Sequence, residues 1–137
     1  MLTRFDSPLS HSGDAISIFD ARVMSRDTDF NLMHLKFKGG QFIVPDNKLP
    51  IETLVRIRVA ARDVSITKKK QSDTSILNIF PAIVEEMAPE GDAQVMVRLS
   101  LKGVVLLACL TRKSATSLKL DQGLSVFIQV KSVAILS

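Results

Sequence analysis

The stretch Ser75-Ile76-Leu77-Asn78-Ile79-Phe80-Pro81-Ala82-Ile83-Val84 decides how the chain is interpreted. It opens with a small polar loop and continues directly as an apolar segment rich in β-branched residues, which is typical of a loop leading into a strand. A similar run occurs earlier, because Ile18-Phe19-Asp20-Ala21-Arg22-Val23 aligns with residues 79–84 at an offset of 61. The stretch therefore opens the second of two similar halves, and an internal repeat has to be weighed before any single motif.

The repeat continues along both halves. Residues 33–39 align with 97–103, and residues 62–66 align with 131–135 at an offset of 69. The second half is thus longer by about eight residues. Part of the surplus is the segment 111–120, whose Ser, Ala and Leu content predicts one short helix capped by Thr111 or Ser114.

Short strands dominate the rest of the pattern. Residues 55–60 alternate cleanly, with Val55, Ile57 and Val59 on one face, and Lys38-Gly39-Gly40 predicts a hairpin turn. We expect an all-β fold of two tandem small OB-like barrels with one short helix. Because each barrel has little core of its own, pairing with the other repeat and with a second chain is expected. The predicted division is a tail at 1–14, a first, degenerate repeat at 15–67, a linker at 68–74 and a second repeat at 75–137.

Composition narrows the function classes. The 137 residues are 46% hydrophobic and carry a net charge of +4, but Trp and Tyr are absent and the basic residues are dispersed. The one run, Lys68-Lys69-Lys70, favours a solvated linker over a nucleic-acid contact. Cys109 indicates a buried small hydrophobe and is compatible with a reducing compartment. The sequence shows no pattern of a signal peptide and no apolar segment long enough to span a membrane.

Catalytic chemistry is not indicated, and we expect no enzyme activity from this chain. His11 and His34 lack partners at metal-ligand spacing, and no glycine-rich phosphate loop is present. The adjacent Glu85 and Glu86 point to opposite faces of a predicted strand, so they do not form an acid–base pair. No metal or cofactor is expected.

Small hydroxyl and amide residues beside isolated cations are the remaining candidates for chemistry. Tetrahedral oxyanions are bound by such donors and by limited positive charge. The candidates are Ser75, Asn78, Thr111, Ser114, Lys131 and Ser132. The structural alternative, favoured by composition and spacing alone, is that Ser75 and Asn78 form a turn, Thr111 caps the helix and Lys131 is solvated.

Several motifs in this order resemble a known family. Residues 74–78, 95–99, 110–114, 118–123 and 128–133 are similar to a molbindin (Mop, TOBE) domain. Residues 26–32, 37–45 and 60–66 are similar to the degenerate Mop-like copy that precedes it in the ATPase subunit of molybdate importers, and residues 2–9 resemble the segment that follows the ATPase domain there.

This resemblance implies a cytoplasmic C-terminal regulatory domain of a molybdate or tungstate importer, peripheral to the membrane through the transporter. Its implied partners are a second copy, the ATPase domain, the membrane permease subunits and a small oxyanion, with no nucleic acid and no direct membrane insertion. Two such domains pair, and the oxyanion is bound at their seam, meaning the contact between two copies. The carried-over ligand residues are Ser75, Ile76, Asn78, Thr111, Ser114, Lys131 and Ser132.

The family pattern is incomplete in this chain. Leu77 stands where the family loop has Arg, which removes a fork-shaped donor suited to an oxyanion. The first repeat has Arg62-Asp63 in place of the Lys-Ser pair and Asp14 in its leading loop, and two carboxylates repel an anion. We therefore expect only the second repeat to contribute a site. The alternative is a dimerisation or scaffolding domain of the same transporter without a functional oxyanion site.

Overall fold

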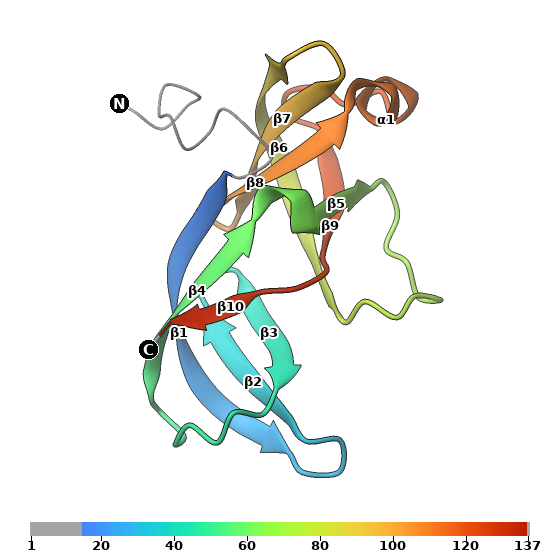
Figure 1. Ribbon diagram of the computed structural model, residues 1–137. Helices are drawn as coiled ribbons and strands as arrows, with labels where there is room; N and C mark the ends of the chain where they lie inside the picture. The colour runs from blue at the N-terminus through green and yellow to red at the C-terminus, as the bar shows by residue number, and fades with distance from the viewer. Residues whose placement is uncertain (1–14, 137) are drawn as a thin grey trace.

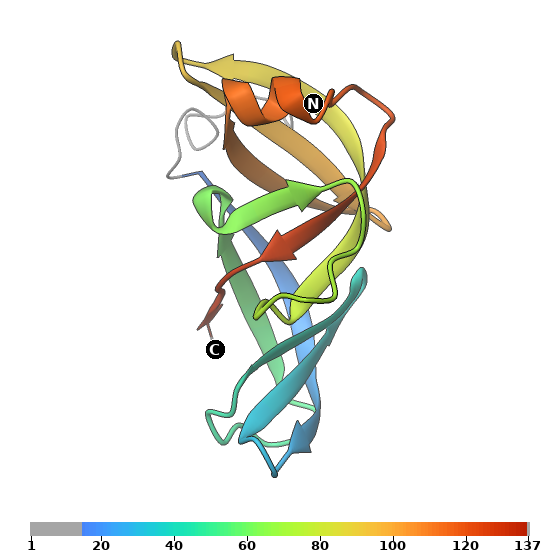
Figure 2. The same cartoon turned by 90° about the vertical axis from the view of Figure 1, so that its right-hand side faces the viewer.

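The computed structural model describes residues 15–136, so the predicted tail at 1–14 lies outside the described residues. Within this range the chain forms two curled five-stranded antiparallel sheets that lie end to end (Figures 1 and 2). The elements are β1 (Ile16–Asp27), β2 (Leu32–Phe37), β3 (Gly40–Pro45), β4 (Leu54–Ala60), the 3₁₀ helix η2 (Ala61–Asp63), β5 (Val64–Thr67), β6 (Asn78–Glu90), β7 (Gln94–Leu101), β8 (Val104–Thr111), α1 (Arg112–Ser117), β9 (Ser125–Val130) and β10 (Ala134–Leu136).

The predicted all-β architecture with one short helix is confirmed. β4 buries Val55, Ile57 and Val59 and exposes the residues between them, as the alternation indicates. The predicted turn joins β2 to β3, and Thr111 is the N-cap of α1. Lys102 and Gly103 join β7 to β8 with φ of 51° and 91°, the left-handed pair that suits a tight hairpin.

The two halves exchange their last strands. The first sheet has the order β10-β4-β1-β2-β3, and the second has the order β5-β9-β6-β7-β8. β5 therefore leaves the first half and pairs with β9, where Val64 lies opposite Val130. β10 makes the reverse exchange and pairs with β4, where Ala134 lies opposite Arg58 (Figure 1). Neither half completes its sheet without a strand from the other. The division of the sequence into repeats at 15–67 and 75–137 stays a prediction.

One hydrophobic core runs through both sheets. Its centre is aromatic: Phe80 of β6 packs with ring centroids 5.5 Å from Phe37 and 4.9 Å from Phe42, both on the first sheet. Close approach of the halves also explains Gly39. A Cβ there would lie 2.7 Å from the Phe37 ring and 3.0 Å from the Leu101 carbonyl oxygen, so a larger residue does not fit without displacement.

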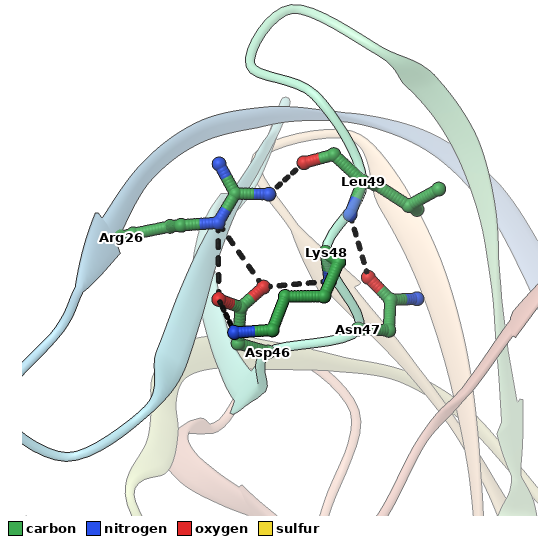
Figure 3. Close-up of polar contacts among 5 residues, drawn as sticks. All are labelled: Arg26, Asp46, Asn47, Lys48 and Leu49. Carbon is green, nitrogen blue, oxygen red and sulfur yellow. Dashed lines mark hydrogen bonds and ion pairs between the residues drawn. The ribbon is translucent and has the colours of Figure 1, made fainter.

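The far end of the first sheet is held by the segment 46–49 (Figure 3). Arg26 donates from Nε to both carboxylate oxygens of Asp46 at 3.1 and 3.0 Å, and from Nη2 to the Leu49 carbonyl. The backbone N–H of Lys48 donates to Asp46 Oδ1 at 2.8 Å. This N–H bond and the adjacent guanidinium hold the pKa of Asp46 below its usual value of 3.8.

Candidate functional site

The loop that opens the second half lies beside the end of β9. Asn78, the first residue of β6, is opposite Val130, the last residue of β9. This register brings the segment before β6 and the segment after β9 to one end of the second sheet. The residues gathered there, which we call the loop cluster, are Ser75, Ile76, Asn78, Lys131 and Ser132.

Most of the loop cluster faces solvent. Ser75, Lys131 and Ser132 are exposed, and Leu77, in the same loop as Ser75, is 59% exposed. Ile76 is half-buried and its backbone N–H donates to Thr74 Oγ1 at 3.2 Å. A hydroxyl and an ammonium group are thus accessible here, and Leu77 adds apolar surface where a guanidinium would add donors.

Asn78 differs from the rest of the loop cluster because it is buried and bonded to the backbone of the first sheet. Its Oδ1 accepts from the Ile43 N–H at 2.7 Å, and its Nδ2 donates to the Ile43 carbonyl at 3.1 Å. Ile43 lies in β3, an edge strand, whose outward backbone groups would otherwise lack a strand partner. The amide of Asn78 therefore serves as a substitute strand partner that joins β6 to β3.

The first half contains the counterpart of this contact. Ser17 aligns with Asn78 at the repeat offset of 61, and its buried hydroxyl accepts from the Leu107 N–H at 3.1 Å. Leu107 lies in β8, which is an edge strand of the second sheet. Each half therefore places its leading polar side chain on the edge strand of the other. Sequence reasoning missed this role, although the matching offset was a signal for it.

Thr111 and Ser114, which we call the helix cluster, lie at the other end of the second sheet. Thr111 of β8 pairs with Gln94 of β7, and Gln94 pairs with Glu90 of β6. Glu90 is the last residue of β6 and Asn78 is the first, so Thr111 lies at the end of the sheet away from the loop cluster. Thr111 Oγ1 accepts from the Ser114 N–H at 3.1 Å and donates to Ser114 Oγ at 3.0 Å. Both side chains are exposed, and they make the capping contacts that the structural alternative predicts.

The Lys131-Ser132 pair meets its repeat counterpart Arg62-Asp63. The Lys131 backbone N–H donates to the Asp63 carbonyl at 2.8 Å, and Ser132 Oγ donates to Asp63 Oδ2 at 3.1 Å. Beside them is a pocket of about 430 Å³, whose lining includes Arg58, Arg62, Asp63 and Ser132. The Asp63 carboxylate opposes an anion at this point, whereas the two guanidinium groups and the nearby Lys131 favour one.

The structure thus divides the predicted ligand residues into two groups within one chain. The loop cluster and the helix cluster lie at opposite ends of the second sheet, where α1 is at the top of Figures 1 and 2 and the loop before β6 lies far below it. A site that uses both groups requires a second chain. Among residues 15–136 no group of three or more His, Cys, Asp or Glu side chains could hold a metal ion.

Comparison with known proteins relates the chain to a protein family and to a solved fold. Residues 74–136 match the family model described as the TOBE domain. The fold is that of the cytoplasmic molybdate-binding protein ModG in a molybdate-bound crystal form, with a TM-score of 0.74, 20% identity, and coverage of 87% of this chain and 94% of that chain. The predicted OB-like barrels are confirmed by this likeness.

The relatives that are similar in sequence carry more specific names than the family model does. The chain is 44% identical over 136 residues to the molybdenum import ATP-binding protein ModC of Albidiferax ferrireducens, covering 99% of this chain and 37% of the relative. It is 39% identical to the protein of the same name from Aromatoleum aromaticum, again covering 99% of this chain and 36% of the relative. The expected resemblance is confirmed, and the chain spans little more than a third of the length of these relatives. Among the described residues no helix is long and apolar enough to cross a membrane.

Proposed function

We propose that this chain is the regulatory part of a molybdate importer's ATP-binding subunit and that it binds molybdate or tungstate at a seam between two copies. Its match to the TOBE family model and its similarity to molybdenum import ATP-binding proteins support this assignment. In this proposal the ATPase domain and the permease subunits are its partners, and it works at the cytoplasmic side of the membrane. ATP hydrolysis belongs to the ATPase domain of such a subunit.

The separation of the loop cluster from the helix cluster is the observation that supports a seam most directly. The loop cluster offers the Ser75 hydroxyl and the Lys131 ammonium, both exposed, and the helix cluster offers the exposed hydroxyls of Thr111 and Ser114. Each is a partial donor set for a tetrahedral dianion. Together, with one from each chain, they supply several hydroxyl donors and a limited positive charge, which is the chemistry that such an anion requires.

Regulation follows from the location of the ligand. An oxyanion that bridges two copies binds the paired arrangement more tightly than any other, and it shifts the equilibrium only by that difference in affinity. Because each copy is attached to an ATP-binding subunit, a paired state that holds these subunits apart restrains transport when the internal oxyanion concentration is high. The imported oxyanion thereby restrains its own import.

Calorimetric titration of the purified chain with molybdate, tungstate and sulfate tests the binding. We expect saturable binding of molybdate or tungstate, and a decrease in affinity of about tenfold or more in Lys131→Ala, since a charge-assisted hydrogen bond is lost. Lys36→Ala is the matched control, because Lys36 is an exposed lysine on β2 and is not in either cluster. Absence of binding at roughly millimolar ligand contradicts the proposal, since such a site is too weak to sense the anion.

A second candidate is a dimerisation or scaffolding domain without a functional oxyanion site. Three features favour it: the Asn78 amide is bonded to Ile43, the Asp63 carboxylate lies 3.1 Å from Ser132 Oγ, and Leu77 takes the place of a cation. This candidate predicts that the chain forms the same dimer with and without oxyanion. Sedimentation velocity in the presence and absence of molybdate distinguishes the two.

A further inference from the structure

The pocket of about 430 Å³ lies where β10 joins the first sheet (Figure 1). Its lining comes from β1, β4, η2 and β10 and from the segment between β9 and β10. Two register pairs place these elements, since Ile16 of β1 is opposite Ala60 of β4, and Ala134 of β10 is opposite Arg58 of β4. Both halves of one chain therefore build the pocket, and its size is that of a small-molecule site.

Charged side chains of both signs line this pocket. Arg58 and Arg62 bring guanidinium groups, and Asp63 brings a carboxylate. Arg58 is exposed, and within residues 15–136 it forms no ion pair. Arg56 on the same face of β4 differs, because its Nε lies 3.8 Å from Asp20 Oδ1. The pocket thus contains a guanidinium group that no carboxylate of the described chain neutralises.

The Asp63 carboxylate keeps acceptor capacity for a ligand. Its Oδ2 accepts from Ser132 Oγ at 3.1 Å. An ionised carboxylate has about four acceptor positions on its two oxygens, so a second donor can bind beside the serine hydroxyl. An ammonium group is such a donor, and its charge complements that of Asp63.

The combination of charges favours a ligand that carries both signs. Asp63 repels a dianion, the two guanidinium groups repel a cation, and an uncharged ligand makes no use of either. A zwitterion matches both, because its carboxylate accepts from a guanidinium and its ammonium group donates to Asp63. The rest of the lining includes aliphatic side chains, which suit an aliphatic part of the ligand: Ile16, Ala60, Val133 and Ala134.

We propose that this pocket binds a free aliphatic α-amino acid, with its carboxylate on Arg58 and its ammonium group on Asp63. The aliphatic side chain of the ligand lies against Ile16 and Val133. Because the ligand contacts β1, β4 and the segment before β10 together, it binds only the folded chain and stabilises the attachment of β10. The site is complete within one chain and does not depend on oxyanion binding.

Calorimetric titration of the purified chain with L-alanine, L-valine and L-leucine tests the site. We expect saturable binding of L-valine or L-leucine at roughly millimolar ligand or below. The analogue 4-methylpentanoate lacks the ammonium group of leucine, and 3-methylbutylamine lacks its carboxylate. Each should bind about tenfold or more weakly than leucine, because one charge-assisted hydrogen bond is lost. No binding of any of the three amino acids at roughly 10 mM, or equal binding of leucine and either analogue, overturns the proposal.

Substitutions in the pocket assign the two charged groups of the ligand. Arg58→Gln should weaken leucine binding about tenfold or more, whereas the matched control Arg56→Gln, at an exposed position on the same strand, should leave it unchanged. Asp63→Asn should weaken leucine binding but tighten binding of 4-methylpentanoate, since an amide does not repel a carboxylate and can donate to it. Loss of both ligands to the same extent in Asp63→Asn would refute the assigned orientation.

The amino-acid site and the oxyanion site are separable by experiment. Ser114→Glu disables the helix cluster, which lies at the other end of the second sheet and does not line this pocket. Leucine binding should therefore be the same in Ser114→Glu as in the wild type, and its loss there would contradict a site built from one pocket. Molybdate binding that persists when no amino acid binds leaves the proposed function intact, so the two proposals fail separately.

Discussion

Replacing Asn78 with Ala tests whether its amide joins the two sheets. The substitution removes the bonds of 2.7 and 3.1 Å to the backbone of Ile43 and leaves an N–H and a carbonyl without a partner. A lost hydrogen bond costs about 1 kcal/mol net, and an unsatisfied backbone group adds more where water is excluded. Because Ile43 is half-buried, we expect unfolding free energy to decrease by about 2–4 kcal/mol.

Urea denaturation followed by circular dichroism measures this effect, with an unchanged slope showing that the unfolded state is unaffected. Ser17→Ala is the matched variant, since it removes one bond, to Leu107, and should cost about 1–2 kcal/mol. Ser75→Ala, at an exposed position, should stay within about 0.5 kcal/mol of wild type. If Asn78→Ala is equally close to wild type, the amide is not a structural link and is available as a ligand.

Three further predictions concern other parts of the chain. Gly39→Ala should lower unfolding free energy by about 1–3 kcal/mol in the same urea assay, because the added Cβ meets the Leu101 carbonyl oxygen at 3.0 Å; a neutral result would show that the turn can shift. Asp46 has a lowered pKa and so stabilises the fold above its ordinary value of 3.8, with the contribution lost as the pH falls below that value. The free energy of unfolding, measured with urea at a series of pH values, should therefore decrease less steeply below about pH 4 in Asp46→Asn than in the wild type, and parallel curves would argue against the ion pair. Leu77→Arg, at a 59% exposed position, should leave stability unchanged and tighten molybdate binding about tenfold by calorimetry, whereas unchanged affinity would show that the loop does not face the ligand.

Local patterns were sufficient to predict most of the elements. The alternation of residues 55–60, the turn at Lys38-Gly39-Gly40 and the cap at Thr111 depend on near neighbours in sequence, and all three are present. The strand exchange of β5 and β10 could not be predicted in this way. A short alternating segment shows that a strand forms, but not which of two similar sheets it joins.

The candidate site was predicted less completely than the fold for the same reason. Asn78 and Ile43 are 35 residues apart, and Ser17 and Leu107 are 90 apart, so their bonds depend on how the halves pack. Sequence order identified residues of suitable chemistry but not that Thr111 and Ser114 lie at the opposite end of β6 from Ser75. The separation became visible only from strand register, and it makes a second chain necessary for a site that uses both groups.

Complementation between two inactive variants tests the proposed seam most directly. Lys131→Glu disables the loop cluster and Ser114→Glu disables the helix cluster, and both substitutions are at exposed positions. We expect neither variant alone to bind molybdate by calorimetry. After mixing under conditions that allow chains to exchange, the mixed dimers hold one intact site each, so about a quarter of the wild-type binding capacity should return. A mixture that binds no molybdate, although the wild type does, would contradict a site shared between two chains.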